Sequence, residues 1–225
     1  MFTNFYTYIF FYILIISCSM GYGLAINSIS KKFKITDNLG YVGLIGVLFL
    51  IIYAYLSSIF IHHGQFHNSI ILIIGLIFFV KFYFFNSKKK KEQWTYFFII
   101  FLILLMGAFF LKTHDDFPYY HFSYSHYLTE NSLIFGMGHF NLGYRTPSSI
   151  FYLNSLFYLP FVKYFMFHMP AILIMGFSNL VLLIKLKKNI ANNQINFITY
   201  FTLLVLIFIN IFFYRISEHG TDKSA

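Results

Sequence analysis

Six runs of apolar residues, each close to the length that crosses a bilayer, constrain this chain more than any other feature. A transmembrane helix needs about 20 mainly apolar residues, and the runs lie at 5–26, 39–61, 69–85, 94–112, 170–186 and 195–214. Only 10% of the residues are charged, whereas a soluble domain usually carries about 25%. The sequence therefore predicts an all-α polytopic membrane protein in contact with membrane lipids.

A seventh apolar run, 149–167, contains Pro160 and Lys163, and the basic loops decide between two placements of it. Lys and Arg are enriched in cytoplasmic loops, and the Lys-rich loops here are KKFK (31–34), KKKK (88–91) and KLKK (185–188). If 149–167 crossed the membrane, the third loop would lie outside. We therefore prefer an interfacial helix at 149–167, which gives six spanning helices and two interfacial ones.

This topology separates the polar chemistry of the chain from its basic loops. It places the N-terminus outside, in what we expect to be a bacterial inner (plasma) membrane. It divides the chain into N-terminal helices, 1–93, and a core, 94–225, with an outer loop at 113–169. All nine histidines then fall on the outer side or at its border: His62, His63, His67, His114, His121, His126, His139, His168 and His219.

Cysteine content and charge exclude several classes of protein. Cys18 is the only cysteine and lies in an apolar run, so the sequence predicts neither a disulfide framework nor a cysteine-based metal site. The net charge of +9 follows from the cytoplasmic loops, and we expect no nucleic-acid partner. The first eight residues contain no Lys or Arg, which favours a retained helix over a cleaved signal peptide.

The outer loop opens with HDDFPYYHFSYSHY, residues 114–127. Asp116 precedes Phe-Pro and is a plausible N-cap for a helix over 118–131. On that helix Tyr120, Tyr124 and Tyr127 form a stripe, as in an interfacial aromatic belt. Asp115 and Asp116 have two interpretations. Either Asp116 caps the helix and Asp115 is solvated, or the pair acts as a general base or binds a divalent cation such as Mg²⁺ or Mn²⁺.

Further polar residues of the outer face are candidates for substrate binding. Arg145 lies in the Gly-rich segment GMGHFNLGYRTPSS (136–149), and Arg215 begins the terminal RISEHGTD, which also carries Glu218 and Asp222. Arginine recognises phosphate through paired hydrogen bonds, although it also occurs beside lipid phosphates without a specific role. The group HHGQFH (62–67) lacks an evident third metal ligand, and we interpret it as a surface turn.

The layout of residues 94–225 resembles the GT-C class of membrane glycosyltransferases. In that class a spanning helix leads into a long outer loop that opens with an acidic motif, and two interfacial helices follow. The acidic position corresponds to Asp115-Asp116 here. Three spanning helices precede the loop, where the class usually has one. HDDFPYYH and EHGTD also look like stretches of a group of bacterial polytopic proteins without an assigned activity.

The resemblance implies transfer of a sugar from a polyprenyl-phosphate-linked donor at the outer face of the membrane. It implies a base or cation-binding role for Asp115 or Asp116, with His114, His121, Arg145, Arg215, Glu218 and Asp222 near the substrate. Two other functions stay open, namely a transporter or flippase and a non-catalytic assembly subunit. The chain also looks like an N-terminal part of a longer protein.

Overall fold

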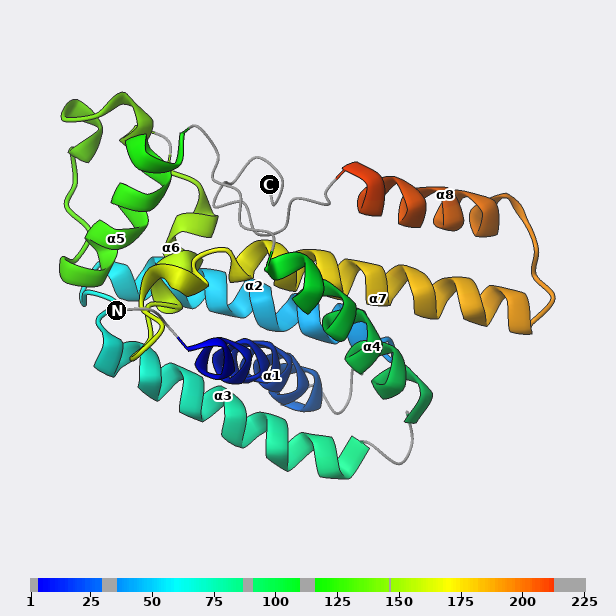
Figure 1. Cartoon of the computed structure of the whole chain (residues 1–225). Coiled ribbons are helices and arrows are strands. Elements are labelled where there is room, and N and C mark those ends of the chain that lie inside the picture. The colour runs from blue at the N-terminus through cyan, green and yellow to red at the C-terminus, as the bar shows by residue number, and fades with distance from the viewer. Residues whose placement is uncertain (1–3, 30–35, 87–90, 110–115, 146, 213–225) are drawn as a thin grey trace.

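The computed structural model describes residues 4–29, 36–86, 91–109, 116–145 and 147–212 (Figure 1). This part of the chain is all-helical, as predicted. Its α-helices are α1 (Phe5–Ile29), α2 (Leu39–Ser58), α3 (Gln65–Asn86), α4 (Lys91–Ala108), α5 (Phe122–Glu130), α6 (Ser149–Leu156), α7 (Met169–Ala191) and α8 (Phe197–Phe212).

Five helical segments of the described chain are long and apolar enough to cross a membrane: Phe5–Ser28, Leu39–Ser58, Gln65–Phe84, Lys91–Ala108 and Tyr164–Ala191. They correspond to five of the six predicted spans. The sixth, α8, is apolar and has 16 residues, a little short of the usual length. The protein is therefore an all-α integral membrane protein.

Helix α1 lies at the centre of the bundle, between α2 and α3, because glycines let the three backbones approach closely (Figure 1). A Cβ atom on Gly46 of α2 would lie 1.9 Å from the Ser19 carbonyl oxygen of α1. A Cβ on Gly21 of α1 would lie 2.0 Å from the carbonyl oxygen of Gly75 on α3. Small residues at such contacts are typical of membrane helix packing.

Helix α7 packs across α2 and α4 through aromatic side chains. The Phe177 ring fills the space over Gly43 of α2, where a Cβ would lie 2.1 Å from a ring carbon. The same ring meets Phe101 of α4 edge-on, with centroids 5.1 Å apart. Helix α8 joins the bundle through α7, where the side-chain amides of Asn179 and Asn210 hydrogen-bond reciprocally.

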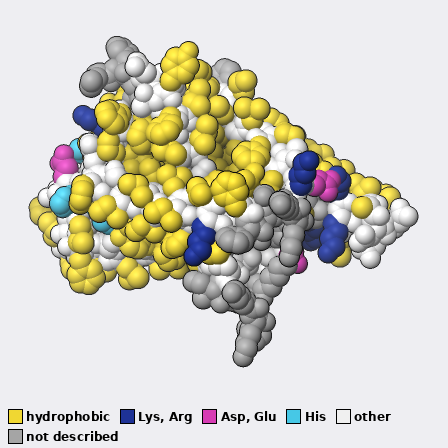
Figure 2. All heavy atoms as spheres, turned by 90° about the horizontal axis from the view of Figure 1, so that it is seen from below, with side chains coloured by type: hydrophobic (Ala, Val, Ile, Leu, Met, Phe, Trp, Pro, Cys, Tyr) yellow, Lys and Arg dark blue, Asp and Glu magenta, His cyan; other side chains and the backbone are white. Residues whose placement is uncertain are grey.

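The bundle has two chemically different ends. At one end, which we call the lysine end, α2 and α4 begin and α7 finishes. There the Leu39 amide donates to Gln93 Oε1 at 3.0 Å, and Lys187 pairs with Glu92. At the opposite end, the histidine end, lie His63, His126 and His168. Figure 2 shows most of the Lys and Arg side chains at one end, His side chains at the other, and hydrophobic side chains between.

The ion pair between Lys187 and Glu92 bears directly on the predicted topology. It places the KLKK loop at the end where α4 begins, beside Lys91 of the KKKK loop. This agrees with the prediction that 149–167 does not cross the membrane. Residues 31–34 of the first basic loop lie outside the described residues.

The prediction of one interfacial helix over 149–167 is wrong in its extent. Helix α6 begins where expected, since the Ser148 hydroxyl accepts from the Ile150 amide at 3.3 Å, but it ends at Leu156. Pro160 cannot donate a helical hydrogen bond. A tight turn follows, in which Phe161 and Lys163 adopt positive φ angles of 68° and 46°.

The surroundings of α6 also differ from the prediction. Its side chains from Ile150 to Leu153 are buried, and the helix packs between α2 and α5. An interfacial helix would turn an apolar face toward lipid. Helix α6 instead turns its apolar residues into the protein.

We predict that Gly46→Ala lowers the stability of the folded bundle, because the new methyl group meets the Ser19 carbonyl. Overpacking of a close contact costs about 1–3 kcal/mol. Denaturation by increasing SDS in mixed micelles measures the loss. The control is Gly64→Ala in the α2–α3 turn, where a Cβ first meets the flexible His62 ring at 3.1 Å. Equal stability of Gly46→Ala and wild type would contradict the close packing described for α1 and α2.

Candidate functional site

The histidine end carries a cap, which we define as residues 116–168. It contains a π-helical turn (Phe117–His121), α5, α6 and the segments that connect them. In Figure 1 α5 and α6 lie beside the end of α2, away from the lysine end. The cap holds most of the described polar residues that the sequence singled out, and its position depends on a buried histidine.

His63, in the turn between α2 and α3, is fully buried, with 0% of its surface exposed. Its Nδ1 lies 2.6 Å from Ser155 Oγ of α6, and its Nε2 lies 2.8 Å from Ser57 Oγ of α2. The Ser155 hydroxyl donates to the Tyr152 carbonyl at 2.8 Å, whereas the carbonyl available to the Ser57 hydroxyl, that of Ala54, is 3.3 Å away. A neutral His63 is therefore best satisfied when Nδ1 donates to Ser155 and Nε2 accepts from Ser57. The prediction of a surface turn for HHGQFH is therefore wrong for this residue.

The rest of this turn also binds the cap. The Asn68 amide donates to the carbonyls of Ser155 and Tyr158, at 2.8 and 2.9 Å, and so satisfies acceptors at the end of α6. The His63 amide donates to the Leu128 carbonyl of α5 at 2.8 Å. His67 stacks on His63 with ring centroids 5.3 Å apart. The α2–α3 turn and the first residues of α3 thus hold both cap helices, α5 and α6, through hydrogen bonds.

The tyrosine stripe of the sequence points partly into the protein. Tyr124 is buried, and its hydroxyl lies 2.8 Å from the hydroxyl of Tyr152 on α6. Burial raises the pKa of the Tyr124 hydroxyl well above its usual range, and the hydrogen bond to Tyr152 adds to that shift. Burial also raises the pKa of Tyr152. Both phenols are therefore neutral. At Tyr124 the predicted interfacial belt is instead a contact inside the cap, whereas Tyr120 and Tyr127 are partly exposed.

A groove of about 480 Å³ opens above this tyrosine pair, between the Gly-rich segment, α2, α5 and α6. Its described lining combines aromatic side chains with two basic ones and contains no Asp or Glu. The polar members are Tyr55, Tyr124, His139, Tyr144, Arg145 and Tyr152. One hydroxyl of the Tyr124–Tyr152 pair donates its proton to the other. The hydroxyl that accepts this hydrogen bond can still donate its own proton to a ligand. The groove suits a ligand with a ring and a negative charge.

Arg145 is exposed at this groove and is held by the Gly-rich segment. Its Nε–H donates to the Gly138 carbonyl at 3.4 Å, which leaves the terminal guanidinium nitrogens to bind other groups. A Cβ on Gly138 would lie 2.8 Å from Arg145 Cγ, so glycine is needed for this close approach. The sequence predicted Arg145 as a ligand-binding residue, and the structure places it in a groove suited to that role.

Asp116 and His121 lie beside the groove and do not line it. Asp116 stands at the N-cap position of the π-helical turn, but its side chain does not cap it. Its carboxylate accepts from the Tyr120 hydroxyl at 3.3 Å. His121 is buried, with its ring against those of Tyr120 and Phe151. The Tyr120 ring packs against Gly143, two residues before Arg145, and so connects the Asp116 region to the wall of the groove.

The other predicted site residues lie outside the described residues: His114, Asp115, Arg215, Glu218 and Asp222. Among the residues that are described, no group of three or more His, Cys, Asp or Glu side chains is arranged to hold a metal ion. A cation at the acidic pair would need His114 or Asp115 beside Asp116. The described residues thus support a ligand groove, whereas the metal site stays a prediction.

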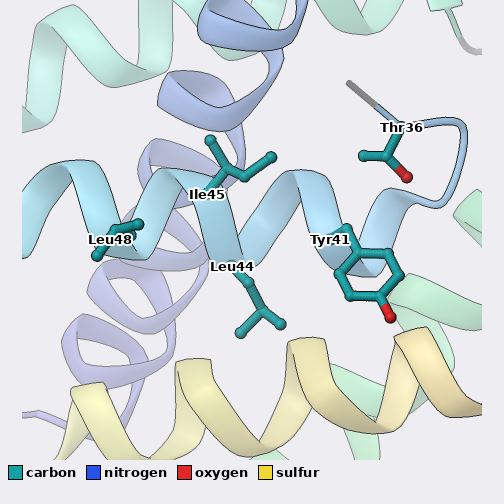
Figure 3. A pocket seen from close by; sticks show the side chains of 5 residues that line it. All are labelled: Thr36, Tyr41, Leu44, Ile45 and Leu48. Carbon is teal, nitrogen blue, oxygen red and sulfur yellow. The ribbon is translucent and has the colours of Figure 1, made fainter. Parts of the chain in front are cut away.

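A second groove, of about 420 Å³, lies on α2 at the lysine end (Figure 3). Its described lining is Thr36, Tyr41, Leu44, Ile45 and Leu48, all from one short segment. In Figure 3 Leu44 points toward the ribbon of α7, whereas Ile45 points the other way. Binding sites bring polar groups together from several elements, so this groove is a weaker candidate than the one at the cap.

Comparison with known proteins assigns the chain to a family without assigning it an activity. A family model described as "Domain of unknown function (DUF8201)" matches residues 6–223, and the chain therefore belongs to this family. Neither the curated proteins nor the solved structures contain a match.

We predict that His63 makes the protein less stable in mild acid. Burial, with smaller contributions from His67 and His62, lowers the pKa of His63 to about 3. Unfolded histidine has a pKa of about 6.5, so between these values only the unfolded state binds the proton. The free energy of unfolding then decreases as the pH is lowered below about 6.5, by up to about 1.4 kcal/mol per pH unit. This decrease ends near pH 3, where folded His63 also binds the proton.

Denaturation of wild type and His63→Gln in mixed micelles at pH 7.5 and pH 5 measures this dependence. The variant is less stable at pH 7.5, because Ser57 and Ser155 lose their partner, and it lacks the part of the pH dependence that comes from His63. His139→Gln is the control, since His139 is exposed and does not contribute to the pKa of His63. The same pH dependence in wild type and His63→Gln would contradict a buried neutral histidine.

Proposed function

We propose that this protein is a GT-C-like membrane glycosyltransferase that uses a polyprenyl-phosphate-linked sugar. In this proposal the histidine end faces the outside of a bacterial inner membrane, and the N-terminus is outside. The observation that carries the proposal is the groove at the cap. It combines Arg145 and His139 with tyrosine rings and lies against α2, whose Tyr55 is in the last turn before the cap. A donor anchored in the bilayer would present its phosphate and sugar at this level.

The proposed reaction assigns a separate task to each region. A carboxylate of Asp115 or Asp116 takes the proton of an acceptor hydroxyl, whose oxygen then bonds to the anomeric carbon of the donor sugar. The bond from that carbon to the phosphate oxygen breaks, and the lipid phosphate leaves with the electron pair. Arg145 stabilises the negative charge of the phosphate through its guanidinium fork.

The remaining predicted residues have supporting roles in this proposal. A Mg²⁺ or Mn²⁺ ion held by Asp115 and Asp116, with His114 beside them, would share in neutralising the phosphate. Arg215, Glu218 and Asp222 would contact the acceptor or the donor. His121 lies behind the Tyr120 and Phe151 rings, and we assign it to holding the π-helical turn that carries Asp116.

Substitution of the acidic pair tests the chemistry. We predict that Asp115→Asn or Asp116→Asn, made in the whole protein, lowers sugar transfer by about 10²–10⁴-fold, the usual contribution of a general base. Transfer is measured in membrane vesicles from a radiolabelled polyprenyl-phosphate hexose. Glu130→Gln is the matched control, because Glu130 is an exposed carboxylate of the same cap.

The outcomes separate the proposal from its rivals. Normal transfer and normal expression in both aspartate variants would show that neither Asp115 nor Asp116 is the catalytic base. Uptake of solute by sealed vesicles, in the absence of transfer, would favour a transporter. If the same substitutions abolish co-purification of a partner and no transfer is found, an assembly subunit would be favoured.

Substitution of Arg145 tests the groove separately from the acidic pair. We predict that Arg145→Gln raises the KM for the lipid-linked donor by about 10–100-fold, because a hydrogen bond to a charged group contributes about 1.5–3 kcal/mol. Lys163→Gln is the control, since Lys163 is an exposed cation of the cap that does not line the groove. An equal KM for Arg145→Gln and wild type would show that the phosphate binds elsewhere.

A further inference from the structure

The two tyrosines in the wall of the cap groove carry one more hydrogen-bond donor than the described residues can pair. Tyr124 and Tyr152 both line the groove, although only 2% and 3% of their surfaces are exposed. Each phenol has one O–H group, and the two oxygens lie 2.8 Å apart, so one O–H donates to the other oxygen. Among the described residues neither hydroxyl has another hydrogen-bond partner. The second O–H is therefore a buried donor without an acceptor, on the wall of a groove.

A third tyrosine of the same groove shows how such a donor is otherwise paired. The Tyr144 hydroxyl donates to Ser123 Oγ at 2.8 Å, and the Ser123 hydroxyl donates to the Tyr119 carbonyl at 3.2 Å. That chain of hydrogen bonds ends on a backbone acceptor, whereas the chain through Tyr124 and Tyr152 ends at the groove. A buried donor without an acceptor is destabilising, so the open chain favours a ligand that supplies an acceptor atom.

The rings of the pair are held in place by their neighbours. The Tyr152 ring meets the Tyr55 ring of α2 edge-on, with centroids 5.1 Å apart. The Tyr124 ring packs against Tyr144 with centroids 5.2 Å apart. The helices that carry the pair, α5 and α6, are themselves held by the hydrogen bonds of the α2–α3 turn. Because little side-chain freedom remains to be lost on binding, the donor is preorganised for a ligand.

The remaining polar groups of the groove define which acceptor fits. The guanidinium of Arg145 only donates hydrogen bonds, and the described lining contains no Asp, Glu, Asn or Gln side chain. A sugar hydroxyl at this position would bring a further O–H that needs an acceptor of its own. An ionised phosphate brings only acceptors, and its oxygens can bond a guanidinium and a phenol at the same time.

We propose that the unpaired O–H of the Tyr124–Tyr152 pair donates to a phosphate oxygen of the ligand, and that the pair thereby selects phosphate-bearing ligands. The phosphate is then bound by the Gly-rich segment through Arg145 and by the cap helices through the phenol. This role rests on the phosphate site of the proposed function and is independent of sugar transfer.

Binding of geranyl phosphate to the whole protein, purified in a neutral detergent and measured by calorimetry, tests this role. The variant Tyr124→Phe/Tyr152→Phe keeps both rings and removes both hydroxyls together. Loss of both partners of a hydrogen bond is nearly neutral for stability, so we expect SDS denaturation like that of wild type. We expect the Kd for geranyl phosphate to rise about 10–100-fold, as for loss of a hydrogen bond to a charged group.

A matched tyrosine and two further probes serve as controls. Tyr127→Phe leaves the Kd unchanged, because Tyr127 of α5 does not line the groove and its hydroxyl donates to the Ser132 carbonyl. Geraniol lacks the phosphate, and its binding is expected to be equal in the double variant and wild type. With inorganic phosphate, a loss of binding in the double variant indicates that the pair also recognises free phosphate. A loss confined to geranyl phosphate indicates recognition of lipid phosphate.

The outcomes separate this role from the proposed phosphate site. An unchanged Kd in the double variant, with a raised Kd in Arg145→Gln, would overturn the role of the tyrosine pair and leave the phosphate site in place. An equal loss of geraniol binding would also overturn it, since the pair would then not recognise phosphate. Wild-type protein that binds neither geranyl phosphate nor inorganic phosphate would contradict both.

Discussion

The buried imidazole of His63 is the contact on which the organisation of the histidine end depends. It connects α2 to α6 through two serine hydroxyls, and the backbone of the same turn connects to α5. Asn68 satisfies the carbonyls at the end of α6. Buried polar groups are costly unless they are fully paired, so this network fixes one position for the cap. The groove with Arg145 exists because α5 and α6 are held there.

The cap also determines the topology of the whole bundle. Because α6 stops at Leu156 and does not cross, α7 begins at the histidine end and finishes at the lysine end, where Lys187 pairs with Glu92. The bundle between the two ends depends on glycines, which let α1 lie in close contact with α2 and α3. The described part of the chain therefore separates a basic end from an end rich in His and Tyr, where the groove with Arg145 lies.

The helices were predictable from sequence because length and hydropathy alone define them, and each predicted span agrees with a helix to within about six residues. Helix α3 begins four residues earlier than predicted, because Gln65, His67 and Asn68 are polar yet helical. The buried His63 was not predictable, since its partner Ser155 is 92 residues away and an isolated serine carries no signal. Residue type alone singles out Arg145 as a candidate, whereas the groove that it lines depends on tertiary contacts of α2 and α6.

The orientation of the two ends is the central claim, and cysteine labelling tests it most directly. Single cysteines replace Phe140, Phe161 and Asn192 in a Cys18→Ala background, and intact cells are treated with a membrane-impermeant maleimide. All three positions are exposed, the first two in the cap and the third at the lysine end. The account predicts labelling at positions 140 and 161 and protection at 192 until the membrane is opened. Labelling at 192 together with protection at 140 and 161 would contradict it.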